Sequence, residues 1–202
     1  YGDVPYFTEM VTTDQVNSLT RTPAQEIFNA IIAECDKLST ELPADYTKLG
    51  LDGIAPAENG RVTCYAALAL KARAALYAAS PLFNPENNKD LWRRAAEANK
   101  EVIETCTANG FKLSKYSELW GPNNWSNNEM IFVRRYNGNI STLEEYNFPM
   151  GVPGGNSGNC PTQNMVDAYE MKATGKMWNE TGSGYDASNP YAGRDPRLDA
   201  SI

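Results

Sequence analysis

Apolar residues recur every three or four positions along three stretches in the first half of the chain. In the most regular of them, residues 61–79, Ala, Leu, Lys and Arg predominate, and these residues have the highest helix propensities. Asn59-Gly60 precedes this predicted helix, and Ser80-Pro81 ends it because proline cannot continue a helix. The spacing predicts a buried stripe: Tyr65, Leu68, Ala72, Ala75, Leu76 and Ala79. Small residues flank this stripe (Ala66, Ala69 and Ala74), so we expect a central helix with partners on more than one side.

Two further amphipathic helices are predicted on either side of it in sequence. The first begins at Thr22-Pro23-Ala24-Gln25, which has the pattern of a capping box with Thr22 at the N-cap, and Pro43 ends it. Its predicted buried stripe is Ile27, Ile31, Cys35, Leu38 and Leu42. The second helix covers residues 90–106, with the predicted stripe Trp92, Ala95, Ala96, Asn99, Val102 and Ile103.

The connection between residues 79 and 90 is short, and this predicts an antiparallel helical hairpin. In this hairpin we expect four bulky side chains to be buried: Tyr65, Leu76, Trp92 and Ile103. The step from Trp92 to Ala95 is typical of the second helix of a tetratricopeptide pair. The pattern as a whole predicts a mainly α fold with tetratricopeptide-like helical hairpins.

Outside these helices the pattern is irregular. Residues 1–21 are expected to be extended, and residues 111–160 are rich in Asn, Gly, Pro, Trp and Tyr. Within that region, residues 130–133 form one short apolar run that fits a strand or a buried turn, and a short helix is predicted near 162–172. We therefore expect one region over residues 1–202, with a helical core at 22–106 and a large loop-rich, ligand-binding part at 107–202. Such long irregular segments in compact chains are usually functional.

Composition narrows the classes of function. The net charge is −7 and no basic cluster exceeds two residues, which excludes a surface for nucleic acid. No apolar run reaches the roughly 20 residues that span a bilayer. The chain begins without Met and without a leader-like stretch, so we expect a mature or excised segment of a longer protein.

The His, Cys, Asp and Glu content of the chain predicts no catalytic residue, no metal site and no cofactor. The chain has no His, which rules out Ser-His-Asp, Cys-His and His-zinc chemistry within it. The four Cys residues form no CxxC pair, and buried small hydrophobes are favoured over a disulfide or a zinc site; they are Cys35, Cys64, Cys106 and Cys160. The paired carboxylates Glu144-Glu145 and Asp167/Glu170 lack the separation that glycoside hydrolysis needs.

Four stretches together resemble one family, the SusD/RagB nutrient-binding lipoproteins of Bacteroidota. They are RVTCYAALALKARAALYAASPLFN, NNEMIF, PTQNMVDAYEMKATGK and NPYAGRDPRL, and the opening GDVPYF fits as well. The chain departs from the family pattern at Ala173-Thr174-Gly175, where Asp-Gly is frequent. The similarity covers the central part of a typical family member, without its lipidated N-terminal Cys and its C-terminal part.

This resemblance implies an α-helical, tetratricopeptide-like fold in a surface-exposed protein of the outer membrane. It also implies non-catalytic binding of glycans or other nutrients and delivery to a SusC-like TonB-dependent transporter. The membrane contact would be made only by a lipid anchor outside this segment. The resemblance does not select the glycan or nutrient, and it leaves a contribution from calcium open.

Recognition of sugars needs flat apolar faces with polar groups at their edges. The irregular region contains four aromatic candidates, namely Trp125, Tyr136, Tyr146 and Phe148. Asn side chains that can donate and accept hydrogen bonds lie among them: Asn123, Asn124, Asn127, Asn137 and Asn139. Trp178 is a further candidate, whereas Trp120 is expected in the core. Each candidate aromatic has an alternative role, which is to anchor its loop to the core.

Arg194-Asp195-Pro196-Arg197 is interpreted as a network that stabilises the fold, because Pro196 fixes a turn and Asp195 can accept from neighbouring donors. Three functions then compete. Non-catalytic glycan or nutrient binding is favoured by the aromatic and Asn-rich loops. A helical-repeat protein-interaction scaffold needs only the hairpins. A glycoside-processing enzyme is disfavoured by the missing His and the lack of a separated carboxylate pair.

Overall fold

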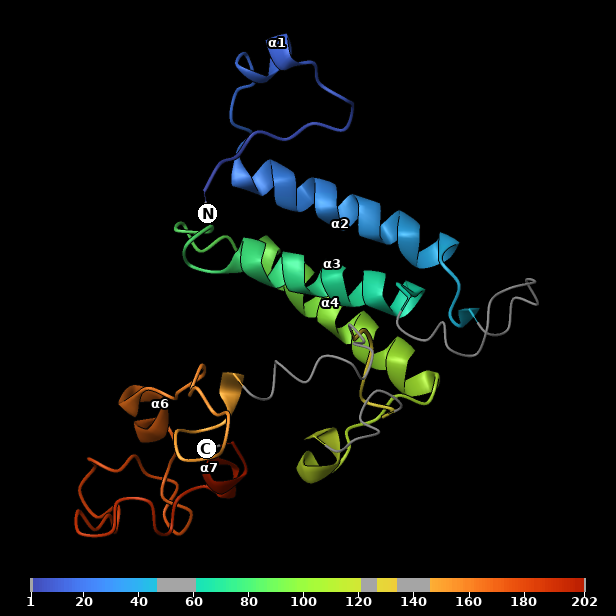
Figure 1. Cartoon of the computed structure of the whole chain (residues 1–202). Helices are drawn as coiled ribbons and strands as arrows, with labels where there is room; N and C mark the ends of the chain where they lie inside the picture. The colour runs from blue at the N-terminus through green and yellow to red at the C-terminus, as the bar shows by residue number, and fades with distance from the viewer. Residues whose placement is uncertain (1, 47–60, 121–126, 134–145, 202) are drawn as a thin grey trace. The chain divides into compact units, whose positions relative to one another are not determined.

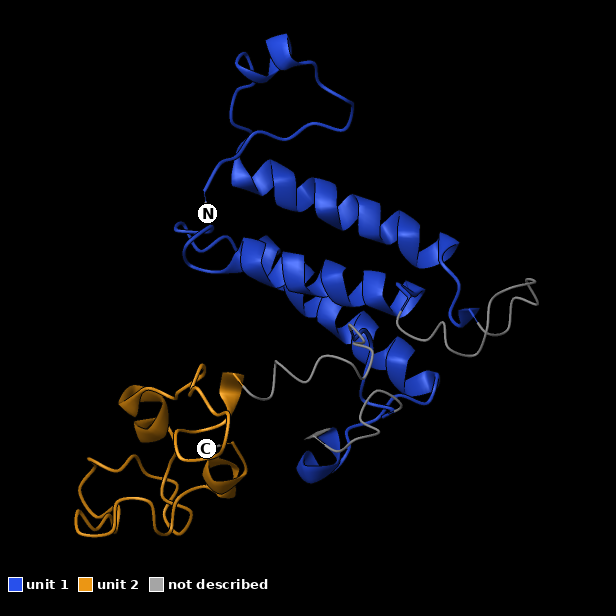
Figure 2. Cartoon of the chain, viewed as in Figure 1, with its two compact units in different colours: residues 1–135 blue, residues 136–202 orange. Residues whose placement is uncertain are grey.

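The computed structural model describes residues 2–46, 61–120, 127–133 and 146–201, which divide between two compact units, residues 1–135 and 136–202 (Figure 2). The first unit contains the helices α1 (Thr13–Val16), α2 (Ala24–Glu41), α3 (Cys64–Ala79) and α4 (Lys89–Ala108) and the 3-10 helix η3 (Tyr116–Trp120). The second contains α6 (Gln163–Asp167) and α7 (Pro196–Ser201) (Figure 1). The described residues contain no strand, only three isolated bridges between residue pairs. The predicted mainly α fold is confirmed.

Helix α3 is the central helix of the first unit. Thr63 caps its start by accepting a hydrogen bond from the Ala66 backbone N–H, and Ser80 ends it before Pro81. It packs against α2 on one side and α4 on the other (Figure 1). Small residues form much of both contacts, which lets the three helices approach closely: Ala72, Ala74, Ala75, Ala79, Ala95 and Ala98 lie with Ile32 in one buried cluster. The predicted central helix and its antiparallel hairpin with α4 are confirmed.

The prediction that four bulky side chains of this hairpin are buried is right only for Tyr65. Leu76, Trp92 and Ile103 are exposed. The predicted stripe of α4 is right for Ala95 and Val102, but Leu91, Ala98 and Cys106 complete its buried face in place of Trp92, Ala96 and Ile103, which are exposed. The reason is steric, since the narrow Ala95 and Ala98 allow close contact with α3 while a Trp or Ile on that face would hold the helices apart.

The capping box predicted at the start of α2 is also wrong. The helix begins at Ala24, and its first N–H donates to Asp3 Oδ1 at 2.9 Å, so that the capping acceptor comes from 21 residues upstream. Gln25 does not turn back to its own helix. Its Nε2 donates to the carbonyls of Ala78 and Phe83, both at 2.8 Å, and so fastens α2 to the end of α3.

The buried stripe of α2 also differs in part from the predicted one. The prediction is right for Cys35, which is buried, and for Ile31, which packs against the core, whereas Ile27, Leu38 and Leu42 are only partly buried; Ile32, which is buried, and Phe28, which packs against the core, were not predicted. Upstream of α2, the segment expected to be extended contains α1, where the Gln15 side chain accepts a hydrogen bond from the Thr12 N–H at 2.9 Å.

An ion-pair network crosses all three long helices. The ammonium of Lys71 on α3 lies 2.5 Å from a carboxylate oxygen of Asp36 on α2 and 2.6 Å from one of Glu101 on α4. Burial alone lowers the pKa of Lys71, but the hydrogen bonds that its ammonium donates to Asp36 and Glu101, and their negative charges, outweigh burial and raise the pKa overall. The charge on Lys71 therefore helps to fix the register of the three helices.

Beyond α4 the apolar run at residues 130–133 contains a bend at Ile131 and Phe132 and no strand, and none of its four side chains is buried, since Phe132 is 55% exposed; neither the predicted strand nor the predicted buried turn is found. Glu129 within NNEMIF accepts a hydrogen bond from the Ser114 N–H at 2.8 Å, and Asn127 accepts one from the Ser114 hydroxyl at 2.6 Å. Asn127 is thus engaged in folding. In the second unit the short helix predicted near 162–172 ends earlier, at Asp167.

Candidate functional site

Residues 146–158 form a closed loop in the second unit, which we call the 146–158 loop. Its base is held by the Gly158 N–H, which donates to the Tyr146 carbonyl at 2.6 Å, and by the Ser157 N–H, which donates to the Phe148 carbonyl at 2.8 Å. The Ser157 hydroxyl accepts from the Met150 N–H at 2.8 Å. These bonds fix the backbone from which the aromatic side chains project.

Glycine is required at two positions of this loop because backbone atoms approach too closely for a side chain. A Cβ atom on Gly158 would lie 2.6 Å from the Tyr146 carbonyl oxygen, and one on Gly155 would collide with the carbonyl oxygen of Pro149. Real Cβ atoms essentially never come within 3.0 Å of such a neighbour. The glycines at 154, 155 and 158 are the sequence signal for this close-packed loop.

The side chains of the loop are apolar and open to solvent. Tyr146 is 62% exposed, and every second residue after it is exposed as well: Phe148, Met150 and Val152. Tyr146 and Phe148 therefore do not anchor the loop to a core. Exposed apolar side chains that gather on one short loop are typical of a surface that binds a ligand or a partner.

Trp178 lies on a second loop of the same unit, residues 174–185, which we call the 174–185 loop. Trp178 is half-buried, and its ring packs edge-to-face against Tyr185, with ring centroids 5.4 Å apart and an interplanar angle of 60°. The guanidinium carbon of Arg194 lies 5.9 Å from the centroid of the Tyr185 ring. Trp178 was predicted from the sequence, but Tyr185 was not; the only signal was its place between Gly184 and Asp186 in a Gly-rich turn.

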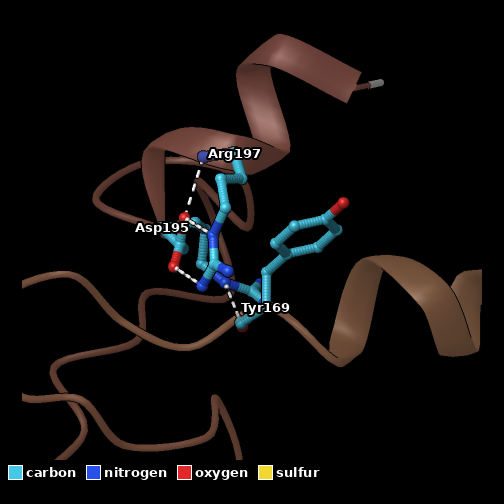
Figure 3. A network of polar contacts seen from close by, with 4 residues as sticks. Tyr169, Asp195 and Arg197 are labelled. Carbon is cyan, nitrogen blue, oxygen red and sulfur yellow. Dashed lines mark hydrogen bonds and ion pairs between the residues drawn. The ribbon is translucent and has the colours of Figure 1, made fainter. Parts of the chain in front are cut away.

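The interpretation of Arg194-Asp195-Pro196-Arg197 as a fold-stabilising network is confirmed. Arg194 is buried and donates to the carbonyls of Val166, Tyr169 and Pro190. Asp195 accepts from the Arg197 N–H at 2.8 Å, from its Nε at 2.9 Å and from its Nη2 at 2.5 Å (Figure 3). Hydrogen bonds from the Arg197 side chain and backbone lower the pKa of Asp195 to about 2.

Two of the predicted aromatic residues, Trp125 and Tyr136, lie outside the described residues, as do Asn123, Asn124, Asn137 and Asn139 and the side chain of Trp120. The structure describes Tyr146 and Phe148 together on one loop and Trp178 on another. All four cysteines are free thiols. Burial is the main cause that raises the thiol pKa of Cys35, Cys64 and Cys106, as expected for small apolar residues, whereas Cys160 is exposed.

Over residues 2–46, 61–120, 127–133 and 146–201, no group of three His, Cys, Asp or Glu side chains is placed to hold a metal ion. None of the helices in the same ranges is both long and apolar enough to cross a membrane.

Comparison with known proteins identifies relatives of one kind, although no family model matches the chain. In sequence the chain is 24% identical over 220 residues to a SusD-like protein of Formosa agariphila, and the match covers 98% of this chain and 37% of that protein. Two crystal structures from Bacteroides fragilis are similar over 98% of this chain. One is a SusD-like protein with a TM-score of 0.70 and 25% identity, of which 38% is covered. The other is a SusD-like carbohydrate binding protein with a TM-score of 0.68 and 27% identity, of which 35% is covered.

The fold and the two loops thus define a helical protein with exposed aromatic side chains on the 146–158 loop and a half-buried Trp178 on the 174–185 loop. The resemblance to the SusD/RagB family indicated by the sequence motifs is confirmed, because the relatives are SusD-like both in sequence and in structure. The chain spans a little over a third of the length of these relatives.

Proposed function

We propose that this chain is part of a SusD-like protein that binds glycans or other nutrients without catalysis. The observation that carries the proposal is the pair Tyr146 and Phe148, two exposed aromatic residues on a loop whose backbone is fixed by hydrogen bonds and glycines. Because the backbone that carries these rings is already fixed, little backbone freedom is lost when a sugar stacks on them. Similarity to a SusD-like carbohydrate binding protein supports the same function.

The proposal extends to the remaining candidate residues. Trp178 would provide a further aromatic contact, and Trp125 and Tyr136 stay candidates from the sequence. Sugar C–H groups would pack on the aromatic faces, and amide and hydroxyl groups at the edges would bind the sugar hydroxyls. No metal or cofactor is needed for binding of this kind.

The cellular setting follows from the family resemblance. We place the parent protein at the outer surface of the outer membrane, held by a lipid anchor outside this segment, where it delivers its ligand to a SusC-like TonB-dependent transporter. Pull-down of such a transporter with the tagged, full-length parent protein from detergent-solubilised outer membranes would test the partnership. Recovery of the parent protein in the soluble fraction alone would contradict this placement.

A second candidate function is supported by a specific observation on the first unit. Apolar side chains on its long helices are exposed, among them Leu70 and Tyr77 on α3 and Ile103 on α4. Such faces are suited to packing against another protein, as in a helical-repeat scaffold. The two candidate functions use different surfaces: a scaffold would bind through helix faces of the first unit, whereas glycan binding would use the loops of the second unit.

The experiment is affinity electrophoresis of the chain in gels that contain maltodextrin, laminarin, galactomannan, xylan or polygalacturonate. We expect retardation by at least one polysaccharide, and about ten- to thirtyfold weaker binding after Tyr146→Ala or Phe148→Ala, because one stacking contact contributes roughly 1–2 kcal/mol. Tyr191→Ala is the matched control, since Tyr191 is 58% exposed in the same unit but lies outside both loops.

The variants separate the two candidate functions. Retardation that is lost with Tyr146 and kept with Tyr191 supports glycan binding at the 146–158 loop. If Tyr146→Ala is retarded as strongly as Tyr191→Ala, the 146–158 loop is not the sugar-binding platform, and Trp178 becomes the next candidate. Absence of retardation in every gel, together with capture of a protein partner that is lost on Ile103→Glu, supports the scaffold.

A further inference from the structure

The indole of Trp178 is the first of three side chains that contact one another in series, and the last of them is the buried guanidinium of Arg194. Trp178 packs edge-to-face on Tyr185, and the ring of Tyr185 lies within cation–π distance of Arg194. Trp178 and Tyr185 are both half-buried, whereas Arg194 is only 6% exposed. The three residues thus pass from the surface into the interior of the second unit.

Arg194 is the fixed end of this arrangement. Its Nη2 donates to the carbonyls of Val166 at 2.9 Å and Tyr169 at 2.7 Å, its Nε donates to Tyr169 at 3.2 Å, and its Nη1 donates to Pro190 at 3.0 Å. Because these carbonyls come from different parts of the chain, the planar guanidinium is held in one orientation. Tyr185 therefore rests on a group that does not move.

The backbone of the 174–185 loop is fixed in the same way around a buried serine. The Ser183 hydroxyl donates to the Trp178 carbonyl at 3.1 Å and accepts from the Tyr185 N–H at 3.2 Å. The Ser183 carbonyl accepts from the Thr174 hydroxyl at 3.0 Å. Ser183 thus ties the backbone of Trp178 to that of Tyr185, while the Tyr185 ring contacts the Trp178 ring.

We propose that Tyr185 is a positioning residue that, anchored by Arg194, holds Trp178 as a preformed platform for a neutral glycan. This inference rests on the proposed function and deepens it by naming the ligand class. Two exposed carboxylates lie on this loop or directly after it, Glu180 and Asp186, against one lysine, Lys176, whose ammonium donates to the Thr181 carbonyl at 2.7 Å. An anionic polysaccharide would meet unfavourable charge here, whereas a neutral sugar needs only the aromatic face.

The test uses the 202-residue chain labelled with fluorotryptophan and observed by fluorine NMR, with the Trp178 signal assigned through Trp178→Phe. Tyr185→Phe keeps the aromatic ring, and Tyr185→Leu removes it. We expect the Trp178 signal to keep its position in the Phe variant and to shift and narrow in the Leu variant as the indole gains mobility. Hydrogen exchange of the peptide covering residues 163–171 reports whether the second unit stays folded, and Tyr185→Met replaces the Leu variant if it does not.

The same samples are then titrated with maltodextrin, laminarin, galactomannan, xylan and polygalacturonate, and binding is followed through the fluorine signal of Trp178. We expect a neutral polysaccharide to shift the Trp178 signal, roughly fivefold weaker binding when the Tyr185 ring is removed, and no shift with polygalacturonate. An unchanged Trp178 signal in the Leu variant overturns the positioning role. A displaced Trp178 with unaltered affinity overturns its use as a platform but leaves glycan binding elsewhere intact.

Two further outcomes are decisive. A shift produced by polygalacturonate alone overturns the ligand class. Absence of binding by the unaltered chain removes the proposed function, and this inference with it, while the spectra without ligand still report whether Tyr185 fixes the indole.

Discussion

Two leucines on α3 allow a sharp test of how the three-helix unit is packed. Leu68 and Leu76 lie on one helix, eight residues apart, and have the same side chain and the same intrinsic helix propensity. Leu68 is 5% exposed, whereas Leu76 is 46% exposed. Substitution of each by Ala removes the same atoms from two different environments. The difference between the two variants therefore measures burial alone.

The expected magnitudes follow from these exposures. Full burial of a leucine side chain stabilises by roughly 1.5–3 kcal/mol, so the half of Leu76 that is covered contributes about 1 kcal/mol. Solvent fills the space that Leu76→Ala leaves, and no cavity forms. Leu68→Ala leaves a cavity in the core and should cost about 2–5 kcal/mol. We therefore expect Leu68→Ala to be more destabilising by at least about 1 kcal/mol.

The assay is urea denaturation of the 202-residue chain followed by far-UV circular dichroism, which reports mainly on the three long helices α2, α3 and α4. Both variants should unfold with the slope of the unaltered chain, so that the shift of the midpoint measures the free energy of unfolding. Equal losses for the two variants, or a larger loss for Leu76→Ala, would refute the packing of α3 described above.

Three further predictions concern the second unit and its chemistry. Gly158→Ala should weaken retention in polysaccharide gels as much as Tyr146→Ala does, because the new Cβ meets the Tyr146 carbonyl, while Gly2→Ala, in open space, should bind normally; normal binding by the Gly158 variant would contradict a role for this loop. The pKa of Asp195 is lowered to about 2 by Arg197, so its contribution to stability is complete above about pH 4 and is lost as the pH falls towards 2. The difference in melting temperature between the unaltered chain and Asp195→Asn should therefore shrink between pH 6 and pH 2.5, and a constant difference would speak against this pair. Reducing-sugar assays with each polysaccharide that retards the chain should detect no hydrolysis. Release of reducing sugar that is abolished by a point mutation in this chain would refute non-catalytic binding.

Local sequence was sufficient to place the three long helices approximately and to pair α3 with α4. Pro81 after the end of α3 acts on neighbouring backbone groups, so its effect was predictable without the rest of the fold, whereas the cap at Thr63 was not predicted. The short connection before α4 restricts where that helix can lie. For the same reason the motif at Arg194 could be interpreted as a stabilising network before its partners were known.

The candidate site was predictable only in part. Tyr146, Phe148 and Trp178 could be selected because aromatic residues in polar, Gly-rich segments are unusual. Whether such a ring is exposed or anchors a loop depends on contacts that the sequence does not specify. Tyr185 was missed for this reason, since its role arises from Arg194 and Trp178, and neither residue is its neighbour in the chain.

The sequence by itself therefore determined where the three long helices lie, that the fold is mainly α, and which family it resembles, because periodicity and motifs depend on residues close together in the chain. Only the tertiary structure decided which face of each helix is buried. On α4 the periodicity admits a stripe through Trp92 as well as one through Leu91. Close contact of Ala95 and Ala98 with the alanines of α3 selects the stripe through Leu91 and leaves Trp92 exposed.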